Sequence, residues 1–285
     1  MTYPVARPSA PLRAGKLRIE PPTSWQGLNL PELWRYRELL YFFVWRDIKV
    51  RYKQTVLGAM WAVLQPLATT VLFAIFFGRF AGMSRQVEQP YGLFIYVAMS
   101  LWTFFATAVS ASANSLVGSS HLISKVYFPR LLIPLSSIVA ALVDFAVAFV
   151  FLLVLLIAYG EMPSARIAAF PLFVLGTAMV AAGTGLTLAA LVVTYRDFRY
   201  VVGFLTQLWL FATPVLYPLH IVPEPWRLLY AINPMVGMVT GARAAVFGDP
   251  FPLDVIGVSF VSAAAILVVG VRYFLKVERR FADVI

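Results

Sequence analysis

The sequence contains no cysteine and only two histidines, and charged residues make up only 13% of its 285 positions. A chain without cysteine has neither a disulfide framework nor a thiolate metal site. His121 and His220 are expected on opposite sides of the apolar stretches described below, so they do not form a metal pair. A glycine-rich phosphate loop and a GxSxG motif are also missing from the sequence. We therefore expect no catalytic site, no metal and no bound cofactor in this chain.

Hydrophobic residues, in contrast, make up 61% of the chain, whereas soluble domains are about half apolar and about a quarter charged. In water such a chain would expose large apolar patches, so lipid is the expected solvent. Six stretches have close to the ~20 apolar residues that a membrane-spanning helix needs. They are residues 60–78, 91–113, 131–159, 167–193, 200–217 and 253–273. The sequence predicts an all-α membrane protein with six transmembrane helices over residues 58–285.

The basic residues lie unevenly about these stretches. If the N-terminus is cytoplasmic, 18 of the 23 lysines and arginines fall on the cytoplasmic side. Because the positive-inside rule relates such a bias to orientation, we expect both termini in the cytoplasm. The net charge of +10 then reflects topology and contact with anionic headgroups, and we expect no nucleic-acid partner. Residues 1–30 lack the apolar core of a signal peptide and are expected to form a flexible cytoplasmic tail.

Residues 31–57 combine aromatic and basic side chains at helical spacing. The basic residues of the second half are Arg46, Lys49, Arg51 and Lys53. A helix with an apolar and a basic face lies in the headgroup plane, so we expect an amphipathic interfacial helix here. Asp47 and Arg51 are expected to form an i,i+4 ion pair. The alternative is a plain basic flank that stops translocation.

The connection between the second and third stretches has a clustered apolar pattern. Five of seven consecutive residues are apolar, namely Leu122, Ile123, Val126, Tyr127 and Phe128. Ser119 or Ser120 can cap a short helix, and the residue before Pro129 is driven out of helical geometry. The sequence therefore predicts a helix of one or two turns at about 119–129 on the cytoplasmic side. An exposed apolar cluster of this kind favours a docking surface, and the alternative is a loop tucked under the protein's own helices.

The connection between the fifth and sixth stretches is divided by Pro223, Pro225 and Pro234. The helical pieces that remain, at 226–232 and 235–247, are too short to cross a membrane. Such pieces can dip into the membrane and return when protein surrounds their ends. We expect a re-entrant helix pair at about 219–248, with flat helices on the outer surface as the alternative.

Asp144 is the one acidic or basic residue that lies well inside an apolar stretch. A charge inside the membrane is costly, so this residue needs a reason. It has no histidine, lysine or second acid at comparable depth, which argues against a proton relay. We expect a neutral side chain that is hydrogen-bonded to Ser136, Ser137 or a neighbouring helix.

Several motifs carry a resemblance to a known family. They are RDIKVRYKQTVLGAMWAVLQPL (46–67), LISKVYFPR (122–130), TYRDFRY (194–200), TPVLYP (213–218) and INPM (232–235). In these segments the sequence resembles the permease subunits of ATP-binding-cassette (ABC) polysaccharide exporters. The form of the first motif is most similar to exporters of O-antigen, and capsule and teichoic-acid exporters are close relatives. The resemblance extends in order from about Glu32 to the C-terminus.

The resemblance implies a homodimer of six-helix subunits with two copies of a separate ATP-binding subunit, which would bind ATP and Mg²⁺. The cargo would be a polysaccharide on an undecaprenyl-diphosphate carrier, moved outward across the bacterial inner membrane. By the same resemblance, the helix near 119–129 would couple to the ATPase. Its coupling residues would be Leu122, Ile123, Lys125, Val126, Tyr127 and Phe128.

Further roles follow from the resemblance together with residue chemistry. Arg46, Lys49, Arg51 and Lys53 would meet the carrier diphosphate as it enters, because arginine and lysine bind phosphate; membrane anchoring is the alternative. The channel-lining residues would be Trp61, Phe73, Trp102, Trp209 and Tyr217. The gate residues would be Asn233, Pro234 and Arg243. Arg243 would face headgroups or polymer.

Two other functional classes remain open. An ion-coupled secondary transporter usually has more buried ionisable groups and internal repeats. A membrane-embedded glycan-processing enzyme would need paired carboxylates or a metal site. The acids expected outside are Glu88, Glu161, Glu224, Asp249 and Asp254, and they show no clustering along the sequence. The residues therefore favour an exporter subunit over both alternatives.

Overall fold

The computed structural model describes residues 30–53, 55, 57–278 and 281. Every regular element in these ranges is helical. The helices of the first half are α1 (Leu30–Arg35), α2 (Arg37–Tyr52), α3 (Trp61–Phe73), α4 (Tyr91–Gly118), α5 (Ser120–Lys125) and α6 (Leu132–Ala158). Those of the second half are α7 (Phe170–Thr194), α8 (Phe198–Phe211), α9 (Glu224–Tyr230), α10 (Pro234–Phe247) and α11 (Leu253–Val277). The all-α prediction is confirmed for this part of the chain, and the expected tail lies almost wholly outside it.

Five helical segments are long and apolar enough to cross a membrane, which makes the chain a multi-pass membrane protein. They are Gly58–Phe80, Tyr91–Gly118, Leu132–Ala158, Ala165–Thr194 and Leu253–Val277. The first consists of a short 3-10 turn, α3 and a π-helical turn at Ala74–Phe80.

The predicted stretch at 200–217 differs from these five. Its helix, α8, has 14 residues and ends at Phe211, so it is about 21 Å long at 1.5 Å per residue. The hydrocarbon core is about 30 Å thick, and α8 is too short to cross it as a straight helix. Pro214 and Pro218 follow the end of α8, and proline supplies no backbone N–H to continue a helix. The described residues therefore contain five full-length spans and the shorter apolar helices α8 and α10.

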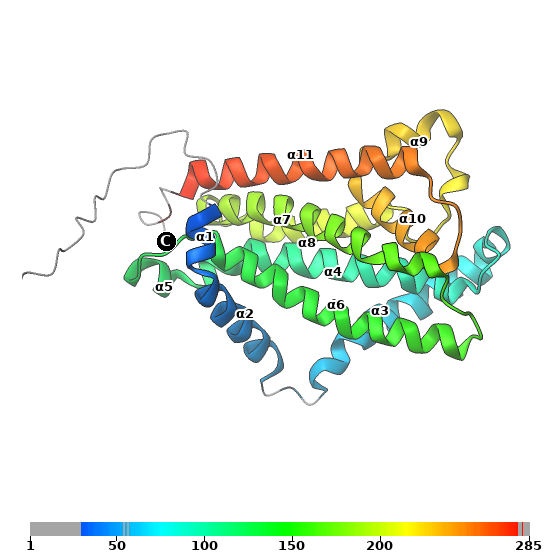
Figure 1. Cartoon of the computed structure of the whole chain (residues 1–285), viewed down its shortest axis with the longest axis horizontal. Helices are drawn as coiled ribbons and strands as arrows, with labels where there is room; N and C mark the ends of the chain where they lie inside the picture. The colour runs from blue at the N-terminus through cyan, green and yellow to red at the C-terminus, as the bar shows by residue number, and fades with distance from the viewer. Residues whose placement is uncertain (1–29, 54, 56, 279–280, 282–285) are drawn as a thin grey trace, which may run out of the picture.

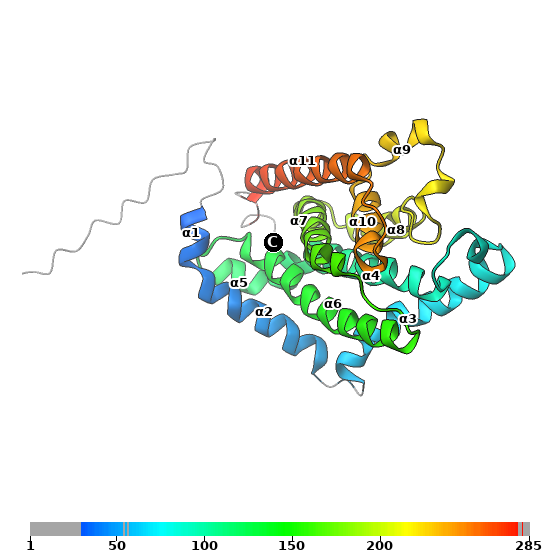
Figure 2. The same cartoon turned by 45° about the vertical axis from the view of Figure 1, so that its right-hand side comes forward.

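The long helices lie side by side along the long axis of the molecule, as Figures 1 and 2 show for α4, α6, α7 and α11. α1 and α5 lie near one end of this bundle, and α9 and α10 lie at the other. α4 occupies the centre: 78% of its most apolar window is buried, whereas only 11% of the corresponding window of the first span is. The first span therefore leaves most of its apolar surface uncovered by this chain.

α7 and α11 pack with their backbones in contact. A Cβ atom added at Gly270 would lie 2.1 Å from the carbonyl oxygen of Gly183. Only glycine allows this approach, which is the small-residue packing typical of membrane helices.

A second apolar cluster lies at the end of the bundle that carries α1 and α5. It joins Phe43 of α2 to Phe128, which lies between α5 and α6, with ring centroids 5.4 Å apart. The backbone N–H of Arg130 donates a hydrogen bond to Oε1 of Glu278, 3.0 Å away, just beyond α11. The segment that follows α5 is thus attached to both α2 and the end of α11.

Candidate functional site

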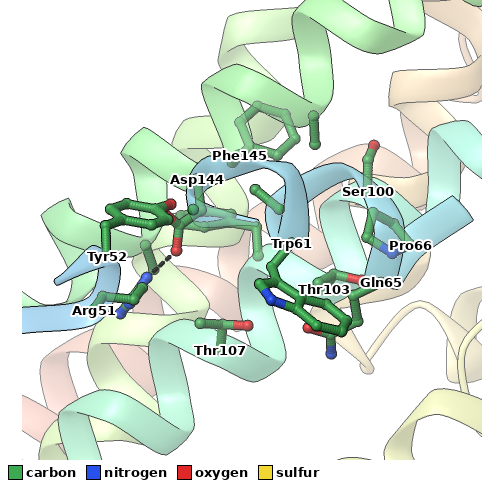
Figure 3. Close-up of a pocket in the computed structure, with 15 residues that line it drawn as sticks. Arg51, Tyr52, Trp61, Gln65, Pro66, Ser100, Thr103, Thr107, Asp144 and Phe145 are labelled. Atoms are coloured by element: carbon green, nitrogen blue, oxygen red, sulfur yellow. Dashed lines mark hydrogen bonds and ion pairs between the residues drawn. The ribbon is translucent and has the colours of Figure 1, made fainter. Parts of the chain in front are cut away.

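A pocket of about 260 Å³ opens where the end of α2 meets α3, α4 and α6. Arg51 and Tyr52 come from α2, and Asp144 comes from the middle of α6. Trp61 and Gln65 of α3 line it as well. From α4 it receives Ser100, Phe104, Thr103 and Thr107. Figure 3 shows Arg51, Tyr52 and Asp144 gathered on one side and Trp61, Gln65 and Thr103 on the other.

Asp144 is held by two side chains from α2. The Arg51 guanidinium donates to Oδ2 of Asp144 and forms an ion pair with it, and the Tyr52 hydroxyl donates to Oδ1. Burial raises the pKa of Tyr52, although the Arg51 charge lowers it, so this hydroxyl stays protonated and can donate. The expected bond to a neighbouring helix is therefore present, since both partners belong to α2, whereas the alternative partners Ser136 and Ser137 bond elsewhere. The expectation of a neutral Asp144 is wrong, because the acid forms an ion pair. Packing of α2 against α6 brings the Arg51 cation to the depth of the acid.

The two serines that we named as possible partners of Asp144 bond to Asp47 instead. Ser136 and Ser137 of α6 donate to Oδ2 of Asp47, at 3.0 and 3.3 Å. Nε and Nη2 of Arg46 donate to its Oδ1, at 3.0 and 2.8 Å. The predicted Asp47–Arg51 pair is therefore wrong. Both residues turn toward α6 instead: Asp47 accepts hydrogen bonds from its two serines, and Arg51 pairs with its acid, so each partly buried charge has a partner.

The opposite side of the pocket is uncharged. Thr103 and Thr107 lie one turn apart on α4, and neither hydroxyl forms a hydrogen bond with any described residue. The same holds for the Gln65 amide and the Trp61 indole N–H in the part of the chain that the structure covers. These groups offer donors, acceptors and an aromatic face to a ligand without net charge.

The four cations predicted to meet the carrier diphosphate differ in their surroundings. Arg46 and Arg51 are paired with carboxylates. The Lys49 ammonium lies 5.1 Å from the centroid of the Trp45 ring, and Lys53 is exposed just after α2. Two of the four charges are thus offset within the protein, and the two lysines remain the better placed for an external anion.

The predicted coupling segment forms a six-residue helix, α5, followed by extended backbone at Val126. No side-chain bond caps α5 at Ser119. Tyr127 is 85% exposed and Val126 57% exposed, and Leu122 and Lys125 are exposed as well. Ile123 and Phe128 are buried in the apolar cluster. The segment is therefore anchored by two apolar residues and presents three others on the surface.

The predicted channel residues also fall into two groups. Trp61 is 55% exposed and lines the pocket, and Phe73 is partly buried against Phe77. Trp102 is buried and packs on Phe105 at 5.1 Å between centroids, and Phe105 is in edge contact with Trp209. Hence Trp102 faces the interior of the subunit in this conformation.

Residues expected at the gate connect α8 to α10. The Asn233 side chain caps α10 by accepting from the Met235 N–H, 3.1 Å away, and Pro234 occupies the first turn. Trp209 Nε1 donates to Oδ1 of Asn233 at 2.8 Å. The Asn233 amide in turn donates to the Ala212 carbonyl at 2.7 Å. Asn233 thus ties the end of α8 to the start of α10. The Tyr217 hydroxyl, 2.8 Å from that of Tyr230, lies in the same connection.

Arg243 of α10 is only 5% exposed, so the expectation that it faces headgroups or polymer is wrong. Its guanidinium donates to the carbonyl oxygens of Phe94, Pro214, Val215 and Tyr217 at 3.0, 2.6, 2.5 and 3.4 Å. It also lies 3.4 Å from the Phe94 ring centroid. The turn after α8 leaves the carbonyls of Pro214, Val215 and Tyr217 without helical partners, and the donors of the arginine satisfy them.

Our sequence reasoning missed Tyr52, Gln65, Thr103 and Thr107. The two threonines follow Ser100 at i+3 and i+7, and a polar stripe on an apolar helix is visible in the sequence alone. The other two residues show no comparable pattern, because only the packing of α2 and α3 brings them to the same pocket.

This arrangement defines a class: a bundle of membrane-crossing helices with a polar, aromatic pocket and an exposed apolar segment at one end. The chain belongs to the ABC-2 type transporter family, whose family description matches residues 38–247.

Curated relatives narrow the comparison. The chain is 34% identical over 223 residues to the O-antigen export system permease protein RfbA of Myxococcus xanthus, which covers 78% of this chain and 85% of that protein. It is 28% identical over 250 residues to a protein of the same name from Klebsiella pneumoniae, covering 87% of this chain and 95% of the relative. The resemblance found in the motifs is therefore confirmed over most of the chain.

Proposed function

We propose that this chain is the membrane subunit of an ATP-driven exporter that moves an O-antigen type polysaccharide outward across the inner membrane. The observation that carries the proposal is the similarity to O-antigen export permeases along most of their length. Capsular polysaccharide and teichoic acid are the alternative cargoes of the same machinery. Transport by an ion gradient without ATP is the rival mechanism.

The energy source is a separate ATP-binding subunit that docks on the segment around α5. Val126 and Tyr127 expose apolar surface there, next to the anchors Ile123 and Phe128. Apolar residues that stay exposed on a well-packed support are typical of a protein interface. The arrangement supports docking rather than a loop tucked under the protein's own helices.

The assembly is a homodimer with two ATP-binding subunits, both termini are cytoplasmic, and the cargo travels on an undecaprenyl-diphosphate carrier. The first span, with its largely uncovered apolar surface, supports a second copy or lipid beside it. Lys49 and Lys53 are the cations best placed to meet the diphosphate, since Arg46 and Arg51 have carboxylate partners.

The outer end of the subunit forms the gate, which consists of α10 and the turn at Asn233 and Pro234. α9 and α10 are re-entrant helices. α8 makes the sixth crossing together with the turn that follows it.

The test is to inactivate the ATP-binding subunit in cells and follow lipid-linked glycan on both sides of the membrane. We expect glycan to accumulate inside and the surface glycan to disappear. The identity of the surface glycan that is lost separates O-antigen from capsule or teichoic acid. Export that continues at the normal rate, or export by the purified chain under an ion gradient alone, would contradict the proposal.

A further inference from the structure

The pocket between α2, α3, α4 and α6 has a chemistry that the diphosphate of the carrier does not explain. The two charged residues in its lining, Arg51 and Asp144, form an ion pair with each other. Tyr52 completes the coordination of the acid. The charged wall is therefore neutralised internally, and an incoming anion would have to displace Asp144 from Arg51 and leave that carboxylate uncompensated.

The uncharged wall has the features that a sugar ring requires. Five of the ten helical threonines that the structure describes donate to the carbonyl four residues earlier, among them Thr177, Thr187 and Thr194. Thr103 and Thr107 do not, so both hydroxyls are available to a ligand in the pocket. A polar group that loses water on binding needs a partner, and a polyhydroxyl ligand supplies one for each.

Size and shape point to a single unit of a polymer. The pocket volume is about 260 Å³, below the ~300–1,000 Å³ of sites for drug-sized ligands. Trp61 is half exposed at its edge and offers an apolar ring face, to which the C–H face of a sugar can pack. The Gln65 amide, with no bond to a described residue, adds a donor and an acceptor from the same helix.

We propose that this pocket binds one uncharged sugar unit of the cargo, with Thr103, Thr107 and Gln65 as hydrogen-bonding groups and Trp61 as the stacking surface. This inference rests on the proposed function, because it assigns a site to the carbohydrate part of the exported polymer. The Arg51–Asp144 pair closes the pocket on the side of α2 and keeps it selective for neutral ligands.

Chemical protection of a single thiol tests the proposal directly, because the chain has no cysteine of its own. The Thr103→Cys variant, assembled with the ATP-binding subunit, is alkylated with and without a lipid-free oligosaccharide of the cargo repeat. We expect the oligosaccharide to slow alkylation several-fold and inorganic diphosphate to leave it unchanged. Met162→Cys is the control, since Met162 is 87% exposed outside the pocket, and its alkylation should not respond.

Equal rates at the Thr103→Cys thiol with and without oligosaccharide would overturn the inference. So would protection by diphosphate alone, which would make the pocket an anion site. A rate that depends on the vesicle lipid and not on the oligosaccharide would assign the pocket to a lipid headgroup, and would overturn the inference as well.

Hydroxyl removal tests the contribution of the pocket to transport. Thr103→Val and Thr107→Val should each lower ATP-dependent glycan transport into vesicles about two- to tenfold at limiting cargo, the effect of one neutral hydrogen bond. The matched control is Thr187→Val, whose hydroxyl bonds within α7 to the Gly183 carbonyl. Unchanged transport by both pocket variants contradicts the inference. Transport by the unaltered complex distinguishes that outcome from a failure of the proposed function, in which no variant exports glycan.

Discussion

Two arginines in this chain, Arg51 and Arg243, are held in opposite ways. Arg51 extends from α2 to one carboxylate on α6, and its side chain stays 29% exposed. Arg243 is buried inside the other end of the bundle and bonds only to backbone carbonyls among the residues that the structure covers. The first contact joins two helices through side chains at one point. The second fixes the path of a backbone turn at several points.

The difference predicts which contact can open during transport. Releasing Arg51 from Asp144 breaks a single ion pair, and water can solvate both groups because both side chains are partly exposed. Releasing Arg243 would leave several buried carbonyls and a buried cation without partners at once. We therefore interpret the α2–α6 contact as adjustable and the Arg243 contact as a fixed point of the fold.

The largest effect is expected from Arg243→Gln. The shorter neutral side chain cannot reach all four carbonyls, and we expect a loss of about 3–5 kcal/mol, the usual cost of breaking a buried charged network. Thermal unfolding in detergent measures it. Arg243→Lys should recover only part of the loss, because an ammonium lacks the planar fork of five donors. A melting temperature for Arg243→Gln equal to that of the exposed-site control Arg79→Gln would show that the carbonyl contacts are not a fixed point.

A smaller effect is expected where α2 meets α6. Asp144→Asn or Arg51→Gln alone should cost about 1–2 kcal/mol, between the values for surface and buried pairs. The double variant should cost less than the sum of the two single changes, because each single change leaves one charge without its partner. The same thermal measurement gives all three values. Strict additivity would mean that the ion pair does not hold α2 to α6.

The neighbouring hydroxyl contacts should contribute less. Ser136→Ala with Ser137→Ala removes the two α6 donors to Asp47, while Arg46 still neutralises that acid. We expect a loss of about 1 kcal/mol, the net contribution of ordinary hydrogen bonds. Faster proteolysis of α2, with the bundle intact, would locate the loss at this contact. Unaltered cleavage of α2 would place its attachment elsewhere.

The smallest effect on stability is expected from Tyr127→Asp, because this side chain is 85% exposed. The unfolding temperature should change little, yet the added charge should reduce co-purification of the ATP-binding subunit. Met162→Asp, on a residue 87% exposed in the loop between α6 and α7, is the matched control and should leave co-purification intact. Normal recovery of the partner with Tyr127→Asp would argue against docking at this segment.

The sequence predicted the features that depend on neighbouring residues. Apolar stretches located the helices α3, α4, α6, α7 and α11, and the spacing around Tyr127 located a short helix with exposed apolar residues. It overestimated the helix at 200–217, since the turn that begins after Phe211 is stabilised by Arg243 of another helix. It also missed the pocket, whose walls come from separate helices.

Composition and periodicity alone thus determined that this chain is a multi-pass helical membrane protein, because burial in lipid is a property of consecutive residues. The motifs indicated the family because a motif, too, consists of consecutive residues. Only the tertiary structure decided which polar groups meet. Arg51 and Asp144 are 93 positions apart in the sequence, and Arg243 and the Phe94 carbonyl to which it donates are 149 positions apart. Such pairs form where packing brings two polar groups out of water together, and no local pattern records that.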